Sequence, residues 1–394
     1  MSAAVPAVPE DGTAEARSRA PALDLPTVLL ALAILLLGLV MVTSASITIA
    51  GRDGAPFAYL QRQLALVLLG LLAAAVSFAV PTRRLEQAAV PLLWLAIALL
   101  AALFVPGLGH LVNGSRRWLR IAGVNFQASE AARLLTLIYV ARYAVRYEEA
   151  LRSGFGGLAR PLGLLGVMAL LLLLEPDFGA ASVLFLTGFG VLFIAGARLR
   201  WVLAMLLAAG GSMALLVLFS TYRMRRLTVF LDPWADPYSS GFQLTQSLIA
   251  IGRGAWFGVG LGASVQKLFY LPEAHTDFLF AVLAEELGLI GVALTLALFL
   301  ALVWRTLLIA RRAYEAGLKF QCYLAAGFGL WLGLQAFVNI GVNMGVLPTK
   351  GLTLPLMSYG RSSLVTTLAW LGIVLRVHYE TMHGTRRAPR EVRG

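Results

Sequence analysis

The sequence predicts an all-α membrane protein, a polytopic bundle of about ten transmembrane helices. Hydrophobic residues make up 59% of the 394 positions and charged residues only 13%, against roughly 45–50% and about 25% in an average soluble domain. Apolar runs of about 20 residues, the length that crosses a bilayer as a helix, recur along the chain. This composition places the chain in lipid.

Ten apolar runs are long enough to be spanning helices. The fifth and sixth are separated by the short polar segment EPDFG, which makes their boundary the least sharply marked. The predicted spans are residues 27–49, 57–80, 86–105, 128–147, 161–176, 178–196, 201–220, 277–304, 321–345 and 356–378. They form a single predicted domain, residues 27–378.

The positions of Lys and Arg predict the topology, because cytoplasmic loops carry more of them. With the N-terminus inside, the larger share of these residues falls in the cytoplasm, so both termini are expected there. Residues 1–26 are polar and rich in Ala and Pro, which predicts a disordered cytoplasmic tail and not a signal peptide. Residues 379–394 are expected to form a basic cytoplasmic tail. The net charge of +12 is spread between apolar runs, so no nucleic-acid partner is expected.

Three outer loops face one compartment and are expected to converge. The longest, residues 221–276, joins the seventh and eighth spans and contains an expected amphipathic helix near SGFQLTQSLIAIG. The others are residues 106–130 and 346–360. These loops are themselves cationic. Long loops follow the charge rule poorly, which is the plain explanation; an anionic ligand on the outer side is the functional one.

Asp277 is the candidate catalytic group. It follows Glu273 and His275 in LPEAHTDFLF, where the eighth span begins. Thr276 is the expected N-cap, and a carboxylate in a first helical turn is stabilised by roughly 0.3–1 kcal/mol, which is the structural alternative. The other titratable residues nearby favour a functional role. Deeper in this span, Glu285 is expected to be buried and held by an Arg or by backbone groups.

Each of the other charged candidates has a structural alternative. Lys350, in the Pro-bracketed LPTKGLTLP, either binds phosphate or extends to the membrane interface. Arg116 and Arg117 in SRRW either recognise pyrophosphate or anchor the loop beside Trp at the membrane surface. Glu130 and Arg133, three residues apart, either contact substrate or neutralise one another on one helix.

Other kinds of site lack a sequence signal. Cys322 is the single cysteine, so no intramolecular disulfide can form, and it is expected to be a small buried side chain. His110, His378 and His383 are isolated and show no zinc-ligand spacing. No G-x-S-x-G motif supports a serine hydrolase.

Long motifs resemble the SEDS family, the shape, elongation, division and sporulation proteins. The resemblance is carried by PEAHTDFLFAVLAEELG (272–288), NMGVLPTKGLTLPLMSYGRSSL (343–364), NGSRRW (113–118), FQASE (126–130), EPDFG (175–179) and GFQLTQSLIAIGRGAWFGVGLG (241–262). It covers essentially the whole chain after residue 26. TKGLTLP is more similar to the cell-division branch of the family than to the elongation branch.

The resemblance implies a peptidoglycan glycosyltransferase that polymerises lipid II at the outer face of the cytoplasmic (inner) membrane. The family's essential aspartate corresponds to Asp277, its important lysine to Lys350, and its arginine before Trp to Arg117. The implied partner is a class B penicillin-binding transpeptidase (FtsI-like), with divisome regulators such as FtsQ, FtsL, FtsB and FtsN at the division septum.

Four positions depart from the family pattern. Ala128 stands where members often carry Pro, Arg133 where they carry Lys, Phe269 where division proteins often carry Glu, and Arg361 where Gly is commoner. The charge at position 133 is retained. These departures bear on substrate geometry or regulation and leave the family resemblance in place.

The expected mechanism uses Asp277 as a general base on a sugar C4 hydroxyl, with inversion at the anomeric carbon of a second lipid-linked sugar. Cationic side chains or a divalent cation, Mg²⁺ or Mn²⁺, would stabilise the pyrophosphate leaving group, and no organic cofactor is expected. The expected substrate-binding residues are Lys350, Arg117, Arg116, His275, Glu130, Arg133, Lys267 and Ser358, with Arg361 a further cationic candidate. The alternatives are a lipid-linked sugar flippase or transporter, a noncatalytic scaffold, and an elongation-type polymerase.

Overall fold

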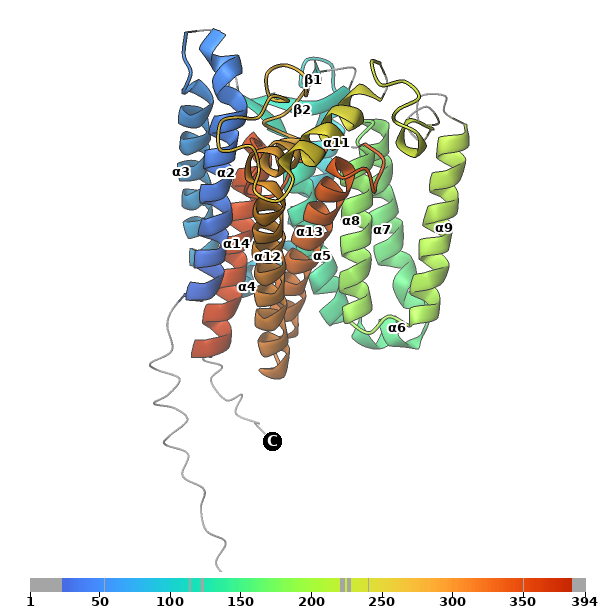
Figure 1. Cartoon of the computed structure of the whole chain (residues 1–394). Helices are drawn as coiled ribbons and strands as arrows, with labels where there is room; N and C mark the ends of the chain where they lie inside the picture. Colours follow the sequence, from blue (N-terminus) through green and yellow to red (C-terminus); the bar gives the residue numbers. More distant parts are fainter. Residues whose placement is uncertain are drawn as a thin grey trace, which may run out of the picture.

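Long helices stand side by side in the computed structural model, and a small sheet and irregular loops cover one end of them (Figure 1). The structure describes residues 23–52, 54–112, 115–121, 124–219, 224, 228–239, 241–349 and 351–384. The end with the sheet also carries the helix α11, and the short helix α6 lies at the opposite end (Figure 1). We refer to the sheet end as the outer end, after the prediction that its loops lie outside the cytoplasm.

Each of the ten predicted spans coincides with one helix. The helices are α2 (Leu25–Arg52), α3 (Ala58–Ala79), α4 (Thr82–Ala101), α5 (Ala128–Arg146), α7 (Phe155–Leu174), α8 (Phe178–Ile194), α9 (Leu199–Leu218), α12 (Leu279–Glu315), α13 (Lys319–Asn343) and α14 (Arg361–His383). Between them lie η1 (Ala102–Phe104), α6 (Glu148–Ser153) and α11 (Phe242–Gly254). Within the described residues six helices are long and apolar enough to cross a membrane: α2, α3, α4 with η1, α7, α12 and α13.

The prediction of an all-α chain is wrong in one outer loop. Three strands, β1 (Gly109–Val112), β2 (Ser115–Ile121) and β3 (Val124–Gln127), form an antiparallel sheet in the order β1-β2-β3. Trp118 of β2 lies opposite Gln127 of β3. The aromatic and β-branched residues of this loop suit a pleated surface. The sheet brings β2 beside the start of α5, which directly follows β3.

The predicted tails are too long at both ends. Asp24 and Leu25 are ordered: Asp24 accepts a hydrogen bond from the Thr27 backbone amide at 3.2 Å and pairs with Arg305 at 2.5 Å, which caps α2. At the other end α14 continues to His383. Glu380, which falls within the predicted basic tail, is a buried residue of this helix and pairs with Arg376 at 2.8 Å. Residues 1–22 and 385–394 lie outside the described residues.

Helices α13 and α14 lie in the interior of the bundle. The side chains of α13 are buried along most of its length, whereas α3 exposes much of its surface. Trp331 of α13 stacks on Trp370 of α14 with ring centroids 5.1 Å apart. Cys322 is buried in α13, as expected for a small apolar side chain. The central position of α13 lets its polar side chains reach two of the outer loops.

Helix α12 is interrupted at Gly288, where φ is +65°. The segment 255–260 bonds to the backbone groups that this break exposes. The Val259 amide donates to the Glu285 carbonyl at 3.0 Å, and the Leu289 amide donates to the Ala255 carbonyl at 2.9 Å. The interruption therefore fixes the longest outer loop against the outer end of α12.

Replacing Gly288 by Ala is expected to destabilise the fold. The new Cβ would lie 2.7 Å from the Trp256 carbonyl oxygen, at a backbone conformation that L residues rarely adopt. Such strain costs of order 1–3 kcal/mol. The loss of stability is measured as the fall in melting temperature of the purified protein in detergent. Gly166→Ala in α7 is the matched control, because its Cβ would meet nothing within 4 Å; equal melting temperatures for the two variants would contradict the account.

Candidate active site

The backbone at Asp277 is held by two amide side chains of α13. Asn339 and Asn343 stand four residues apart on one helix face, and their Nδ2 atoms donate to the Asp277 carbonyl at 2.9 and 3.0 Å. The Asn343 Oδ1 atom accepts from the Ala281 amide at 3.1 Å, which satisfies an exposed donor in the first turn of α12. Asn339 also donates to the Leu352 carbonyl at 2.5 Å. One face of α13 therefore joins Asp277 to the loop 351–360.

The prediction that Thr276 is the N-cap of α12 is wrong. Helix α12 begins at Leu279, and Phe278 occupies the N-cap position without a side-chain cap. The Thr276 hydroxyl donates to Glu273 Oε2 at 2.7 Å, within the same turn. Asp277 thus precedes the helix. The side-chain cap in the first turn of α12 comes from Asn343, which accepts from the Ala281 amide.

The Asp277 carboxylate is partly exposed, and its oxygens accept no hydrogen bond from the described residues. Gly351 lies against it: a Cβ on Gly351 would stand 2.9 Å from Asp277 Oδ2. A side chain there would crowd the carboxylate, so glycine allows this close approach. Lys350 is adjacent in sequence but lies outside the described residues.

Burial raises the pKa of Asp277 to about 7. Burial is the largest cause of this raised pKa, the carboxylates of Glu273 and Asp177 contribute to it, and the Arg117 guanidinium opposes it. A carboxyl group that titrates near the working pH can accept a proton and later release it, which is what general-base chemistry needs.

Arg117 approaches the turn between α7 and α8. Its Nη2 atom donates to the Pro176 carbonyl, and it forms no ion pair with a described residue. Asp177, one residue further on, caps α8 by accepting from the Ala180 amide at 3.1 Å. The positive charge of Arg117 therefore stays unpaired among the described residues and acts electrostatically on the Asp277 carboxylate.

Glu175 lies in the same turn and was not predicted as a site residue. It is 1% exposed, and neither carboxyl oxygen has a hydrogen-bond partner among the described residues. Its pKa is raised to about 8, chiefly by burial and also by Asp177, and Arg117 opposes the rise. Because the protonated group carries no charge, Glu175 leaves Arg117 unneutralised at neutral pH. The polar EPDFG segment between two apolar runs was the sequence signal for this turn.

Glu130 and Arg133 pair with each other in the interior, which confirms the structural alternative. Arg133 Nη1 also donates to Gln335 Oε1 at 2.9 Å, and Gln335 Nε2 donates to the Thr353 carbonyl at 3.0 Å. This chain of contacts connects α5, α13 and the loop 351–360. Arg133 thereby supports the loop that carries Gly351, and a direct contact with substrate stays a prediction for both members of the pair.

His275 packs with two tyrosines near Asp277. Its ring centroid lies 4.9 Å from Tyr59 and 5.7 Å from Tyr359, and the Tyr359 amide donates to the His275 carbonyl at 3.0 Å. Burial lowers the pKa of His275, opposed by Glu273. Ser358 accepts from the Leu354 amide at 3.0 Å and so closes the turn before Tyr359. Both predicted residues therefore shape the loop beside Asp277.

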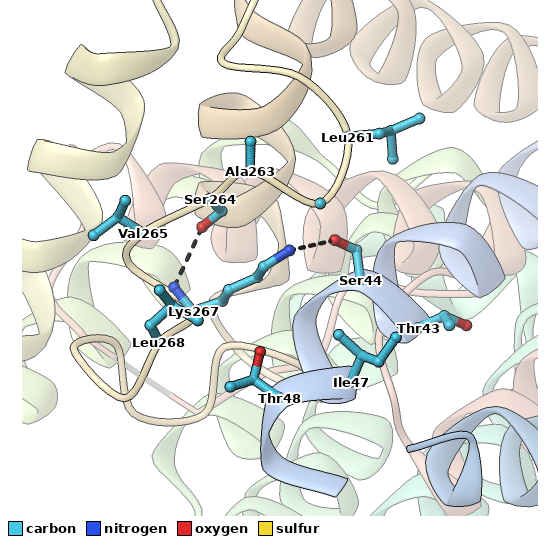
Figure 2. Close-up of a pocket in the computed structure, with 11 residues that line it drawn as sticks. Thr43, Ser44, Ile47, Thr48, Leu261, Ala263, Ser264, Val265, Lys267 and Leu268 are labelled. Atoms are coloured by element: carbon cyan, nitrogen blue, oxygen red, sulfur yellow. Dashed lines mark hydrogen bonds between the residues drawn. The ribbon is translucent and has the colours of Figure 1, made fainter. Parts of the chain in front are cut away.

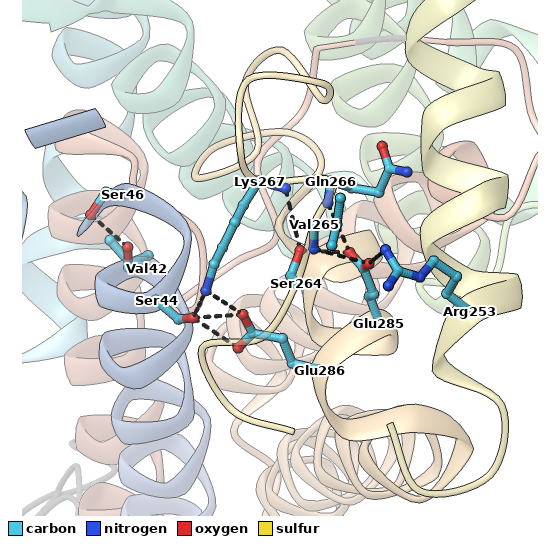
Figure 3. Close-up of polar contacts among 10 residues, drawn as sticks. All are labelled: Val42, Ser44, Ser46, Arg253, Ser264, Val265, Gln266, Lys267, Glu285 and Glu286. Atoms are coloured by element: carbon cyan, nitrogen blue, oxygen red, sulfur yellow. Dashed lines mark hydrogen bonds and ion pairs between the residues drawn. The ribbon is translucent and has the colours of Figure 1, made fainter. Parts of the chain in front are cut away.

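Lys267 is placed differently from expectation. It is 2% exposed, and its Nζ atom bonds to Glu286 at 2.7 Å and to Ser44 of α2 at 2.8 Å (Figure 3). Its charge is thus neutralised inside the protein, which leaves no free charge for phosphate. Glu285 is 0% exposed and accepts from the Val265 amide at 3.1 Å and pairs with Arg253 at 3.3 Å, as expected for a structural carboxylate.

The structure gives less information on the two remaining cationic candidates, Arg116 and Arg361. Arg116 lies in β2, but its side chain is outside the described part of the structure; Arg361 begins α14 and is partly exposed. Among the described residues, no three His, Cys, Asp or Glu side chains are grouped to hold a metal ion. A divalent cation held by substrate phosphates together with one or two carboxylates stays a prediction.

Comparisons with known proteins identify the family. The model FTSW_RODA_SPOVE, described as "Cell cycle protein", matches residues 25–383, so the chain belongs to this family of multi-helix membrane proteins. A relative from Thioalkalivibrio sulfidiphilus is 57% identical over 362 residues, which cover 91% of this chain and 90% of the relative. One from Coxiella burnetii is 50% identical over 355 residues, 90% of this chain and 95% of the relative. Both are named "Probable peptidoglycan glycosyltransferase FtsW".

Solved structures share the fold. One, described as "Structural coordination of polymerization and crosslinking by a peptidoglycan synthase complex", is 33% identical with a TM-score of 0.74 and covers 91% of this chain and 98% of its own. The crystal structure of the Thermus thermophilus rod shape determining protein RodA is 32% identical with a TM-score of 0.68 and covers 91% of this chain and 97% of its own. The helical arrangement is therefore that of the family.

Proposed function

We propose that this protein is a peptidoglycan glycosyltransferase that polymerises lipid II into glycan strands during septal wall synthesis. The observation that carries the proposal is the Asp277 carboxylate, which is held through its backbone, lies beside Gly351, is acted on electrostatically by Arg117, and accepts no hydrogen bond from the described residues. The printed names of the relatives support the same activity.

In the proposed reaction, Asp277 takes the proton of the acceptor's C4 hydroxyl. The oxygen attacks the anomeric carbon of a second lipid-linked sugar, and the bond from that carbon to the pyrophosphate oxygen breaks. Positioned base catalysis contributes typically 10²- to 10⁴-fold. The carboxylate must be ionised to act, so the reaction requires a pH near or above the Asp277 pKa of about 7.

Cationic side chains stabilise the departing pyrophosphate in this scheme. Arg117 is the described candidate, because its guanidinium is not ion-paired to a described residue and acts electrostatically on Asp277. Arg116, Lys350 and Arg361 remain proposed partners. Arginine suits the role since its planar fork matches two phosphate oxygens. Lys267 is left out, because Glu286 already neutralises it.

The carboxyl groups near Asp277 favour direct displacement with inversion. Retention would need a second carboxylate free to attack the anomeric carbon. Glu175 is buried, Asp177 caps α8 and Glu273 accepts the Thr276 hydroxyl, so none of the three is placed as a free nucleophile. Asp277 therefore acts as base and not as a covalent partner.

The proposed topology has ten crossings, both termini in the cytoplasm and Asp277 on the outer face. Asp24 lies 3.9 Å from His378 near the end of α14, so the first and last helices meet at the end opposite the sheet (Figure 1). The solved synthase complex supports a class B penicillin-binding transpeptidase (FtsI-like) as partner. Contacts with the divisome regulators FtsQ, FtsL, FtsB and FtsN, and placement at the septum, follow from the family resemblance.

The flippase alternative needs open polar groups on both sides of the membrane. At the end opposite the sheet, Asp24 is paired with Arg305 and Glu380 with Arg376. The unneutralised groups described above, around Asp277 and Arg117, lie at the outer end. This asymmetry favours a polymerase.

Asp277→Asn is expected to abolish polymer formation from purified lipid II, because the amide cannot accept the hydroxyl proton. The amount of glycan polymer is measured by gel analysis. Membrane insertion and transpeptidase binding are expected to stay intact. Asp232→Asn, an exposed acid in the same outer loop, is the matched control and keeps activity. Polymer made at the normal rate by Asp277→Asn would remove Asp277 from the role of base.

Gly351→Ala is expected to lower the polymerisation rate by about 10²-fold, the size of effect that misplacing a reacting group has. The methyl group would crowd Asp277 Oδ2 at 2.9 Å. Gly360→Ala in the same loop is the control, since its Cβ would stand 3.4 Å or more from its neighbours. If the two variants are equally active, Gly351 does not position the carboxylate.

A further inference from the structure

A cavity separate from the groups around Asp277 lies between α2 and the outer loop 261–268 (Figure 2). Its volume is about 550 Å³. Ile47 and Thr48 line it from α2, and Leu261, Val265 and Leu268 line it from the loop. The lining is mostly apolar, with hydroxyl groups interspersed. Such a lining suits a hydrocarbon chain better than a sugar or a phosphate.

The cavity is accessible from the lipid. Ile47 is 37% exposed and continues the row of exposed apolar residues on α2, which includes Leu32, Leu36 and Val40. These positions are four or seven residues apart, one or two helical turns, and so share one helix face. On the loop side Leu261 is 61% exposed. A lipid chain could thus enter sideways from the outer leaflet without crossing a polar barrier.

The polar groups at the cavity carry no net charge. Lys267 extends across it from the loop to Ser44 of α2, with its ammonium bonded to Ser44 and Glu286 (Figures 2 and 3). The Ser44 hydroxyl also donates to the Glu286 carboxylate at 2.7 Å. The aliphatic stem of Lys267 is left as part of the wall. This closed network excludes an anionic headgroup as the ligand and leaves an uncharged chain.

The cavity stands at a suitable distance from Asp277. Glu286, which bonds to Lys267 at the cavity, follows the first residue of α12 by seven positions, so it lies roughly 10 Å along the helix from the end that Asp277 precedes. In an acceptor lipid II, two sugars and a pyrophosphate separate the reacting C4 hydroxyl from the lipid tail. A donor places its pyrophosphate directly on the reacting carbon, so its tail would begin much nearer to Asp277. The separation fits the acceptor.

We propose that this cavity binds the polyprenyl tail of the acceptor lipid II, the molecule whose C4 hydroxyl Asp277 deprotonates. The inference rests on the proposed function, since that function supplies the substrate. It assigns α2 and the loop 261–268 a role in substrate affinity, apart from the chemical step. The Lys267–Glu286–Ser44 contacts hold the two walls of the cavity together.

Filling the cavity tests the proposal. Ile47→Trp from α2 and Leu261→Trp from the loop each place a large ring in it; Val40→Trp, on the same exposed row but outside the cavity, is the matched control. Polymerisation by each variant is measured with lipid II carrying the natural long tail and with a short-tailed analogue. We expect both cavity variants to lose at least about tenfold in kcat/KM for the long-tailed substrate, equivalent to losing about two buried methylenes.

The short-tailed substrate and the control keep their wild-type values if the cavity holds the tail. An equal loss with both substrates, or no loss with either, would overturn the proposal. A wild-type protein that makes no polymer from either substrate would instead count against the proposed function.

A binding measurement keeps the proposal testable without activity. Native mass spectrometry with added undecaprenyl phosphate should show the wild type and Val40→Trp retaining the lipid, and Ile47→Trp and Leu261→Trp losing at least about tenfold in occupancy. The same titration with phosphatidylglycerol shows whether the site binds lipids in general, because a general site would lose both lipids equally. Equal losses for both lipids, or undiminished polyprenyl binding to the filled variants, would contradict a polyprenyl site.

Discussion

The geometry around Asp277 depends on two asparagine side chains of α13 that bond to its backbone carbonyl. Asn339 and Asn343 fix where the residue stands without using its carboxylate. Asn339 also bonds to Leu352, so one helix face positions both Asp277 and the loop that brings Gly351 against it. The carboxylate is left open, and partial burial raises its pKa to about 7. A base poised in this way needs rigid support that does not neutralise it.

Helix α12 combines this site with the membrane-facing cavity. Asp277 precedes its first turn, Glu285 and Glu286 anchor the long outer loop, and Gly288 interrupts the helix so that the loop backbone can bond to it. Buried carboxylates at this depth are tolerated because each is paired or hydrogen-bonded. The acidic residues between Asp277 and Glu286 thus divide into structural anchors, Glu285 and Glu286, and an open base, Asp277, a division set by which partners the loop supplies.

Sequence alone predicted where the long helices of the described residues lie, because apolar runs of about 20 residues match the thickness of the bilayer. It also anticipated the Glu130–Arg133 pair and the structural role of Glu285, since spacing and depth restrict what such groups can do. It did not predict the three-stranded sheet, whose short strands resemble loop sequence. Lys267 was misplaced as a phosphate ligand, because its partners Glu286 and Ser44 come from other elements. Asn339 and Asn343 were missed, although their four-residue spacing in an apolar span was visible.

The pH dependence of polymerisation tests the central claim most directly. An Asp277 base with a pKa of about 7 is protonated and inactive below that pH, so kcat/KM should rise through neutrality and level off above it. Arg117→Gln removes the charge that lowers this pKa and should move the midpoint to higher pH. A kcat/KM that is flat from about pH 5 to 9, or a midpoint unchanged by Arg117→Gln, would contradict an open Asp277 carboxylate tuned by Arg117.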